Sequence, residues 1–495
     1  MSKSQYLSKS DFLKYQTCPA YLWMWKNKRE VVPVEDGEDV ERRIEQGIEI
    51  EDLARLLFPG SVLVEARLDQ ARAKTEEYIS EGNETIFQAT VFAEGGLLAM
   101  ADVLKKNEAG NWDIYEVKSN TEIKKEHTFD AAFQKVAFER AGYTIDHVNI
   151  VHLNKDYRLH GKVHPPGLFE IENADEQISA VKADVEAMVI DAVNYIKHSE
   201  EPRTCNCNLS PKSKHCPTFK HFHPEVPDYS IYNLTRISAK KVNSLVDMDI
   251  YHIPDVPDDF DLTEKQRNQT TVAKIQRALI DHDEIRKEIG KLKFPLYFLD
   301  YETVSTAVPI FQNTWPYQQV CFQYSLHILR EPEGELEHYE HLAQKKDGHP
   351  IPGLLAQMKA DIGPIGSVIV WNKGFEMGRN REMATDYPEY KDFLLGVNDR
   401  VYDLMEIFSN QYHVHPAYHG SVSIKYVLPV LAPDLSYKAL EDIQNGAIAT
   451  LRWYESVAKP MTEERRQKIY ATLLKYCELD TLAMVRIYEH LTEII

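Results

Sequence analysis

The feature that most constrains the fold is a set of cysteines divided between two distant points of the chain. Cys18 lies near the start, whereas Cys205, Cys207 and Cys216 follow much later, in a stretch rich in Asn, Ser, Pro and Lys. Six cysteines in 495 residues are too few for a disulfide scaffold, and cysteines in polar loops are more typical of metal ligands than of a packed core. Four thiolates suit a structural zinc ion or an iron–sulfur cluster, and both remain open here. The sequence therefore predicts one metal centre that ties together the two ends of residues 1–225.

Charge and hydropathy narrow the class of protein. The 77 acidic and 57 basic residues give a formal net charge of −20, which argues against a protein that coats nucleic acid through a basic surface. A nuclease is still compatible, because metal-binding carboxylates and a local basic groove can share one acidic chain. The first residues lack the apolar core of a signal peptide, and no apolar run is long enough for a membrane span. We therefore expect a cytoplasmic protein without a membrane partner.

Hydrophobic patterns divide the chain into three regions. Residues 1–225 and 286–495 each mix strand-like and helix-like patterns, which favours two α/β domains. Residues 226–285 are polar and are expected to form a short helical connector; the stretch resembles a helix-hairpin-helix without its turn glycine, and a plain linker helix is the alternative. The expected elements are helices at 40–57, 130–141, 175–195 and 463–492, and strands at 97–104, 112–118, 147–153, 294–299, 320–329 and 368–371.

A predicted hairpin carries the first set of chemically informative residues. Asp102 ends one strand, and Glu116 and Lys118 lie two apart on the next, so they share a face. Two carboxylates beside a lysine can hold Mg²⁺ or Mn²⁺, and the lysine can orient a water or balance the charge of a phosphate. An ordinary ion pair on a solvated strand face is the alternative interpretation.

With Gln134 on the following helix, these residues resemble the PD-(D/E)XK nuclease core in its RecB-type form. The resemblance implies a restriction-endonuclease-like fold in which Asp102, Glu116, Lys118 and Gln134 are catalytic. Phe138 stands where many members have a tyrosine. The metal ligands implied are Glu51, for which Glu45 and Glu49 compete, together with Asp102, Glu116 and Val117.

The cysteine arrangement resembles that of the CRISPR-associated RecB-like exonucleases. There, one early and three late cysteines hold a [4Fe–4S] cluster, which implies this cofactor for Cys18, Cys205, Cys207 and Cys216. The Cys205-x-Cys207 spacing is tighter than this pattern leads one to expect, so Zn²⁺ stays as the alternative.

A second set of acids lies in the last region. Asp300 and Glu302 follow a buried strand and face the same side, Glu376 follows another strand, and Tyr476 and Asp480 share a helix face. Their order resembles that of the DEDD (DnaQ-like) 3′–5′ exonucleases, with Glu376 where aspartate is usual. The resemblance implies an RNase H-like fold, two metal ions bound by Asp300, Glu302, Glu376 and Asp480, and a water-orienting Tyr476.

These patterns together predict a metal-dependent nuclease with two potential sites. Single-stranded DNA ends are the expected substrate, and RNA remains open for the second site. The expected role is in DNA repair, recombination or defence. The alternative is a nucleic-acid-binding or scaffolding protein in which one or both sites are degenerate.

Overall fold

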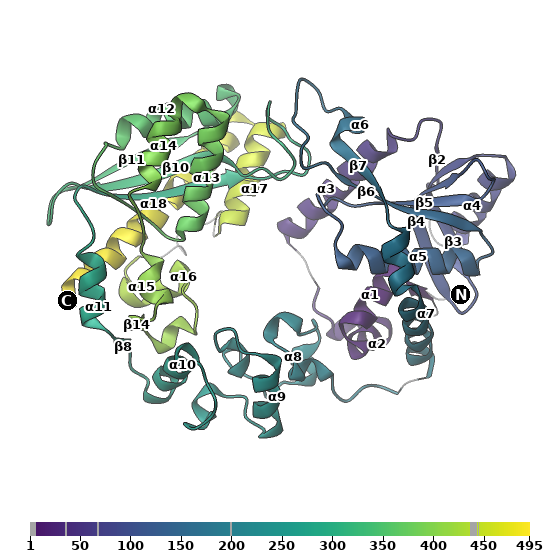
Figure 1. The fold of residues 1–495 in the computed structure, drawn as a ribbon, viewed down its shortest axis with the longest axis horizontal. Helices are drawn as coiled ribbons and strands as arrows, with labels where there is room; N and C mark the ends of the chain where they lie inside the picture. The colour runs from purple at the N-terminus through teal and green to yellow at the C-terminus, as the bar shows by residue number, and fades with distance from the viewer. Residues whose placement is uncertain (1–5, 35–36, 67–68, 199, 436–442, 444) are drawn as a thin grey trace. The chain divides into compact units, whose positions relative to one another are not determined.

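The computed structural model describes residues 6–34, 37–66, 69–198, 200–435, 443 and 445–495. The chain has a mixed α/β fold and divides into two compact units (Figure 1). The first comprises Met1–Val226 and Thr306–Tyr317, and the second comprises Pro227–Ser305 and Gln318–Ile495. Within the described ranges, no helix is both long and apolar enough to cross a bilayer.

The first unit is built on one mixed sheet in the order β2-β3-β4-β5-β6-β7, with β1 paired to β4. β4 and β5 are antiparallel neighbours, as the predicted hairpin requires, and β5 pairs in parallel with β6. Parallel pairing needs a crossover, and α5 supplies it. The strands are β1 (Leu7–Ser8), β2 (Val62–Leu63), β3 (Thr85–Ala93), β4 (Leu97–Lys106), β5 (Trp112–Val117), β6 (Ile145–Leu153) and β7 (Phe169–Asn173).

Helices pack on this sheet through small and aromatic residues. The buried face of α5 carries Ala131, Phe133 and Val136 into the main core. Phe133 stacks on Phe12 of α1 with ring centroids 5.2 Å apart, and Ser8 caps α1. The helices are α1 (Lys9–Thr17), α2 (Pro19–Asn27), α3 (Glu38–Arg55), α4 (Asp69–Ser80), α5 (Lys125–Arg140), α6 (Pro165–Leu168), α7 (Asp175–His198) and α8 (Phe219–Phe222).

A short stretch from the second half of the sequence also belongs to the first unit. The backbone of Leu159 exchanges two hydrogen bonds with this stretch, donating to Thr314 and accepting from Asn313. Arg158 lies over the ring of Trp315, 4.1 Å from its centroid. The first unit is therefore assembled from two separate segments, whereas the sequence placed residues 306–317 in the third region.

The second unit has a five-stranded sheet in the order β11-β10-β9-β12-β13. β9, β10 and β11 form an antiparallel meander, while β12 is parallel to β9 and β13 is parallel to β12. β8 and β14 form a separate two-stranded sheet. The strands are β8 (Leu279–Ile280), β9 (Leu296–Val304), β10 (Val320–Leu329), β11 (Leu336–Leu342), β12 (Ser367–Val370), β13 (Val401–Asp403) and β14 (His413–Val414).

Helices cover both faces of the larger sheet in the second unit. Tyr324 of β10 donates a hydrogen bond to Asp361 of α12, whereas its neighbour Gln323 donates to the Leu473 carbonyl of α18. Because consecutive strand residues face opposite sides, α12 and α18 lie on opposite faces. The helices are α9 (Ala239–Asp247), α10 (Glu264–Ile275), α11 (His282–Ile289), α12 (Pro350–Asp361), α13 (Lys373–Asp386), α14 (Lys391–Asn398), α15 (Met405–Ser409), α16 (Ile424–Leu431), α17 (Gly446–Ala458) and α18 (Glu463–Glu493).

The stretch expected to be a connector forms part of the second unit. It carries the short helices α9 and α10, and the turn after α9 is made at Asp249, whose φ is 59°. Aspartate tolerates this left-handed conformation better than most residues, so the turn forms without the glycine that a helix-hairpin-helix would have there.

Candidate functional site

The hairpin of the first unit brings Asp102 and Glu116 to neighbouring positions on β4 and β5. Asp102 is buried, and its Oδ2 accepts a hydrogen bond from the backbone N–H of Val117 at 2.9 Å. Lys118, directly after β5, donates to Glu116 Oε1 at 2.7 Å. The three residues of the hairpin motif therefore lie together, and Val117 contributes its amide.

Two further charged groups complete this first site, and the sequence analysis missed both. Lys9, at the start of α1, donates to Glu116 Oε1 at 2.8 Å and lies 3.4 Å from Asp130 Oδ1. Asp130 of α5 also accepts a hydrogen bond from Lys118. Neither residue belongs to a local motif, so only the packing of α1 and α5 beside the hairpin reveals them.

Gln134 and Glu51 both lie at this first site. Gln134 is fully buried, and its Nε2 donates to Glu116 Oε2 at 2.5 Å. Glu51 of α3 accepts from Gln88 Nε2 at 3.0 Å. Burial raises the pKa of Glu51, and the charge of Glu116 raises it further, which places the two carboxylates within electrostatic range.

Ion pairing dominates the electrostatics of the first site. Burial and the charge of Glu116 raise the pKa of Asp102 well above its usual value. Burial also acts to raise the pKa of Glu116, but the ammonium groups of Lys9 and Lys118 outweigh it and hold that pKa below its usual range. Both oxygens of Glu116 are thus engaged, and a divalent ion there competes with Lys9 and Lys118 at Oε1 and with Gln134 at Oε2. Among the described residues, no three metal-binding groups converge here as they do in the second unit.

The second site joins acids from β9 and α18. Asp300, Glu302 and Asp480 each bring a carboxylate oxygen within 4.8 Å of those of the other two. Burial raises the pKa of both Asp300 and Glu302 well above the usual range, and the charge of Asp480 raises them further. Three acids so close together repel one another unless a cation is bound. The donor set consists of hard oxygen ligands, which fits Mg²⁺ or Mn²⁺.

Glu376 adds a fourth acid from the first turn of α13. Burial raises the pKa of Glu376 to about 9, and the charge of Asp300 adds to the shift. Its Oε2 is buried and has no hydrogen-bond partner within the described part of the chain. Asp403 accepts from the backbone N–H groups of Asn372 and Lys373 at 3.0 and 2.9 Å, so it fixes the turn that presents Glu376.

Tyr476 and its neighbour on α18 face the same acids. Burial raises the pKa of Tyr476, and the charges of Asp480 and Glu302 raise it further, so the phenol stays protonated. The Cys477 thiol donates to Asp300 Oδ2 at 3.8 Å. Sequence reasoning did not single out Cys477, since nothing in its spacing distinguishes it from a packed thiol.

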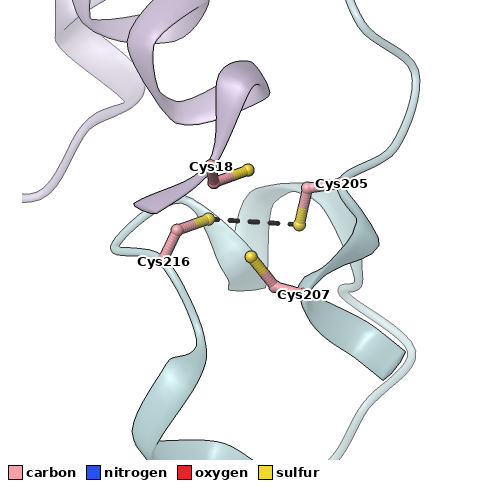
Figure 2. Close-up of side chains that lie close together, drawn as sticks. All are labelled: Cys18, Cys205, Cys207 and Cys216. Atoms are coloured by element: carbon pink, nitrogen blue, oxygen red, sulfur yellow. Dashed lines mark hydrogen bonds between the residues drawn. The ribbon is translucent and has the colours of Figure 1, made fainter. Parts of the chain in front are cut away.

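The cysteines form the third candidate site (Figure 2). The Sγ atoms of Cys18, Cys205, Cys207 and Cys216 all lie within 4.8 Å of one another, and all four residues are buried. Cys18 comes from the junction of α1 and α2, while the other three come from the segment after α7, as Figure 2 shows. The predicted convergence of one early and three late cysteines is therefore present, and none of the four is in a disulfide.

The sulfur spacing bears on which metal group fits. Cys205 Sγ and Cys216 Sγ are 4.0 Å apart, and ligands at 2.3 Å from a tetrahedral zinc ion lie roughly 3.8 Å from each other. A cluster with irons between the sulfurs needs wider spacing. Thr218 Oγ1 lies 3.3 Å from Cys216 Sγ, and His223 Nε2 is hydrogen-bonded to the Cys205 carbonyl rather than directed at the sulfurs.

A cavity of about 1100 Å³ lies between the cysteine centre and the first carboxylate site. Its lining includes Cys18 and Cys207 of the cysteine centre and Lys118 and Asp130 of the first carboxylate site. Lys214 contributes a second cation to the wall. The two centres of the first unit therefore share one solvent-accessible space.

Comparison with known proteins identifies relatives without a described activity. A family described as "Domain of unknown function (DUF2779)" matches residues 297–423, which contain Asp300, Glu302 and Glu376 but end before α18. The "Uncharacterized protein MG366 homolog" of Mycoplasma pneumoniae is 27% identical over 215 residues, covering 40% of this chain and 32% of that protein. The "Uncharacterized protein UU173" of Ureaplasma parvum is 25% identical over 290 residues, covering 52% of this chain and 40% of that protein. The chain thus matches about a third to two fifths of the length of these relatives.

Proposed function

We propose that the protein is a metal-dependent nuclease with one candidate active site in each unit. The observation that carries the proposal is the convergence of Asp300, Glu302 and Asp480, which bring carboxylate oxygens within 4.8 Å of one another. Buried like charges are unfavourable without a cation, and paired divalent ions held by carboxylates are a recurring solution for phosphodiester hydrolysis.

The sheet topologies support a specific fold for each unit. In the second unit, the order β11-β10-β9-β12-β13 corresponds to 3-2-1-4-5 when the strands are numbered along the chain. The second strand, β10, is antiparallel to the other four, which are parallel to one another. This is the arrangement expected of an RNase H-like fold. In the first unit, an antiparallel β3-β4-β5 meander, a crossover helix and the parallel strand β6 agree with a PD-(D/E)XK core.

The chain's own groups have distinct roles in the proposed reaction. Bound divalent ions would supply charge stabilisation and an activated water at the carboxylates. Tyr476, held protonated by its burial, donates a hydrogen bond that orients the attacking water. In the first unit, Lys118 has a raised pKa: burial opposes the shift, but the charges of Glu116 and Asp130 outweigh it. Lys118 therefore remains an ammonium group, which suits balancing the charge of a phosphate better than removing a proton.

We propose that the four cysteines hold a structural metal group that closes the first unit. The resemblance described above implies a [4Fe–4S] cluster, whereas the sulfur spacing favours a single Zn²⁺ ion. Iron and zinc analysis of anaerobically purified protein, together with its absorbance, decides between them. One zinc per chain and no visible absorbance identify zinc; four irons and a brown colour identify the cluster.

DNA with a single-stranded end is the proposed substrate, and RNA is the second substrate to test. Product release from end-labelled DNA and RNA with Mn²⁺ should be compared for the wild type, Lys118→Ala, Asp300→Asn and the double variant. Loss of cleavage in one single variant assigns the working site. Asp399→Asn, at an exposed acid directly after α14, serves as the matched control.

A nucleic-acid-binding scaffold is the second candidate, and one observation favours it for the first unit. Both oxygens of Glu116 are engaged by Lys9, Lys118 and Gln134, which leaves this acid less available to a metal. Binding of labelled DNA without cleavage, in the wild type and in every variant, would support the scaffold and contradict the nuclease.

A further inference from the structure

A separate cluster of metal-binding side chains lies in the second unit, apart from the four acids. His327 of β10, His338 of β11 and Glu478 of α18 each offer one ligand atom, and these atoms lie within 4.8 Å of one another. Ligands around a tetrahedral zinc ion at 2.0–2.1 Å are roughly 3.4 Å apart. To bind one ion, the three ligand atoms would have to draw together by at most roughly 1.4 Å, and the two stacked rings would have to turn towards it.

The strand register explains why the two histidines meet. His327 and His338 are directly opposite each other in the antiparallel β10–β11 pair. Their rings are stacked with centroids 4.5 Å apart. Two imidazolium groups at this distance would repel each other, which disfavours a charge on both rings at once. Neutral imidazoles are the form that binds a metal.

One ring nitrogen of each imidazole is hydrogen-bonded to a hydroxyl group. His327 Nδ1 is hydrogen-bonded to Thr481 Oγ1 at 2.8 Å, and His338 Nε2 is hydrogen-bonded to Ser325 Oγ at 2.9 Å. The two hydroxyls are themselves 2.8 Å apart. A metal-binding histidine characteristically has its second ring nitrogen fixed by such an outer partner. We therefore take His327 Nε2 and His338 Nδ1 as the nitrogens available to an ion.

A nearby acid adds negative charge to the cluster. Glu340 follows His338 by two residues on β11, so the two side chains face the same side of the strand. Two carboxylates beside two imidazoles form a set of donors that attracts a dication. The mixed nitrogen and oxygen donors favour Zn²⁺ over Mg²⁺.

We propose that His327, His338 and Glu478 form a Zn²⁺ site that fastens α18 to the strands β10 and β11. Two ligands belong to the sheet and the third belongs to the helix that carries Tyr476 and Asp480, so the ion acts as a clamp between them. Three protein ligands leave one position for water. This assignment does not depend on the nuclease activity proposed above.

Zinc stoichiometry of the full chain tests the site. The protein is purified with the metal of its cysteine centre in place and is dialysed to remove loosely bound ions. Zn²⁺ binding is then measured for the wild type, His338→Gln and Glu478→Gln. The wild type should bind one more equivalent than either variant. Other zinc-binding groups are present in all three proteins and cancel in the comparison. Equal stoichiometry in all three would overturn the proposal.

Matched controls separate the site from general effects of substitution. His341→Gln changes a histidine on the same strand whose ring faces Tyr324 instead, and Glu464→Gln changes an exposed acid on the same helix. Both should bind zinc like the wild type.

Ser325→Ala, which removes the outer partner of His338, should weaken binding about 10–100-fold. If circular dichroism shows that His338→Gln does not fold, Glu478→Gln decides, because Glu478 is only half-buried.

Cobalt substitution locates the ion independently. The difference spectrum between Co²⁺-loaded wild type and Glu478→Gln should show ligand-field bands without the intense sulfur-to-cobalt charge transfer of a thiolate site. A difference spectrum with that charge-transfer band would place the extra ion at the cysteines and would contradict the proposal.

Discussion

Lys9 Nζ lies 2.8 Å from Glu116 Oε1, although the two residues are 107 positions apart in the chain. The contact joins the first turn of α1 to the end of β5, and it adds a second ammonium group to a site that already contains Lys118. Two lysines therefore hold the central carboxylate of the first unit ionised, whereas burial raises the pKa of Asp300 and of Glu302 in the second unit. This difference predicts different responses to substitution and to pH.

Replacing Lys9 with methionine should destabilise the first unit. The substitution removes one of two cations from buried Glu116, and breaking a buried ion pair costs about 3–5 kcal/mol. The side chain of Lys9 is 32% exposed, so solvent screening reduces the expected loss to about 1–3 kcal/mol. Urea unfolding of the two proteins measures the difference.

The same substitution should strengthen binding of Mn²⁺ at Glu116, because the ion no longer displaces Lys9. Lys14→Met is the matched control, since Lys14 lies on the same helix over the ring of Trp25. Weaker Mn²⁺ binding by Lys9→Met than by Lys14→Met would contradict this role for Lys9.

In protein without bound metal, the second site should make the free energy of unfolding fall as the pH rises. Burial raises the pKa of Glu376 from its ordinary 4.5 to about 9. The folded state thus binds this proton more tightly than the unfolded state does, so the stabilisation is complete below pH 4.5 and is lost towards pH 9. One such group changes stability by at most about 1.4 kcal/mol per pH unit. Glu376→Gln should reduce this slope in metal-free protein.

Divalent ions should reverse the trend, since a metal binds the ionised carboxylates. Urea unfolding at about pH 6, 7.5 and 9, with and without Mn²⁺, measures both effects. The slope of the unfolding free energy against pH is compared in metal-free wild type and metal-free Glu376→Gln. Equal slopes would show that Glu376 is not protonated in the folded protein.

The cysteine centre should be required for the first unit to fold. Cys18→Ser removes the one ligand that comes from the junction of α1 and α2, and metal-binding free energy contributes directly to folding. We expect loss of the bound metal and a lower melting temperature. Cys321→Ser is the control, because Cys321 is equally buried but lies in β10, outside the cysteine group. Full metal content in Cys18→Ser would disprove this assignment.

Local pattern predicted the elements better than it predicted the complete sites. Alternation of apolar residues predicted a strand at 320–329, and the structure has β10 at those residues. The strand expected at 294–299 instead begins at Leu296 and continues to Val304, so Asp300 and Glu302 lie within β9 and not after it. Hydrogen bonds to β10 continue through both acids, and tertiary pairing of this kind leaves no signal in local sequence.

Long-range partners were the main gap in prediction. Asp102, Glu116 and Lys118 have a recognisable spacing, but Lys9 and Asp130 reach the same site only through the packing of helices on the sheet. His327 and His338 were likewise two among 19 histidines. Their pairing depends on the β10–β11 register, which a pattern of single residues does not encode.

Crystallography of the wild-type protein with Mn²⁺, using the anomalous signal of manganese, tests the central claim most directly. We predict at least one manganese peak bonded to carboxylate oxygens of Asp300, Glu302 and Asp480, at about 2.0–2.2 Å, the range for divalent ions with oxygen ligands. The peak should be absent in Asp480→Asn. If crystals with saturating Mn²⁺ show no anomalous peak at these three carboxylates, the account is contradicted.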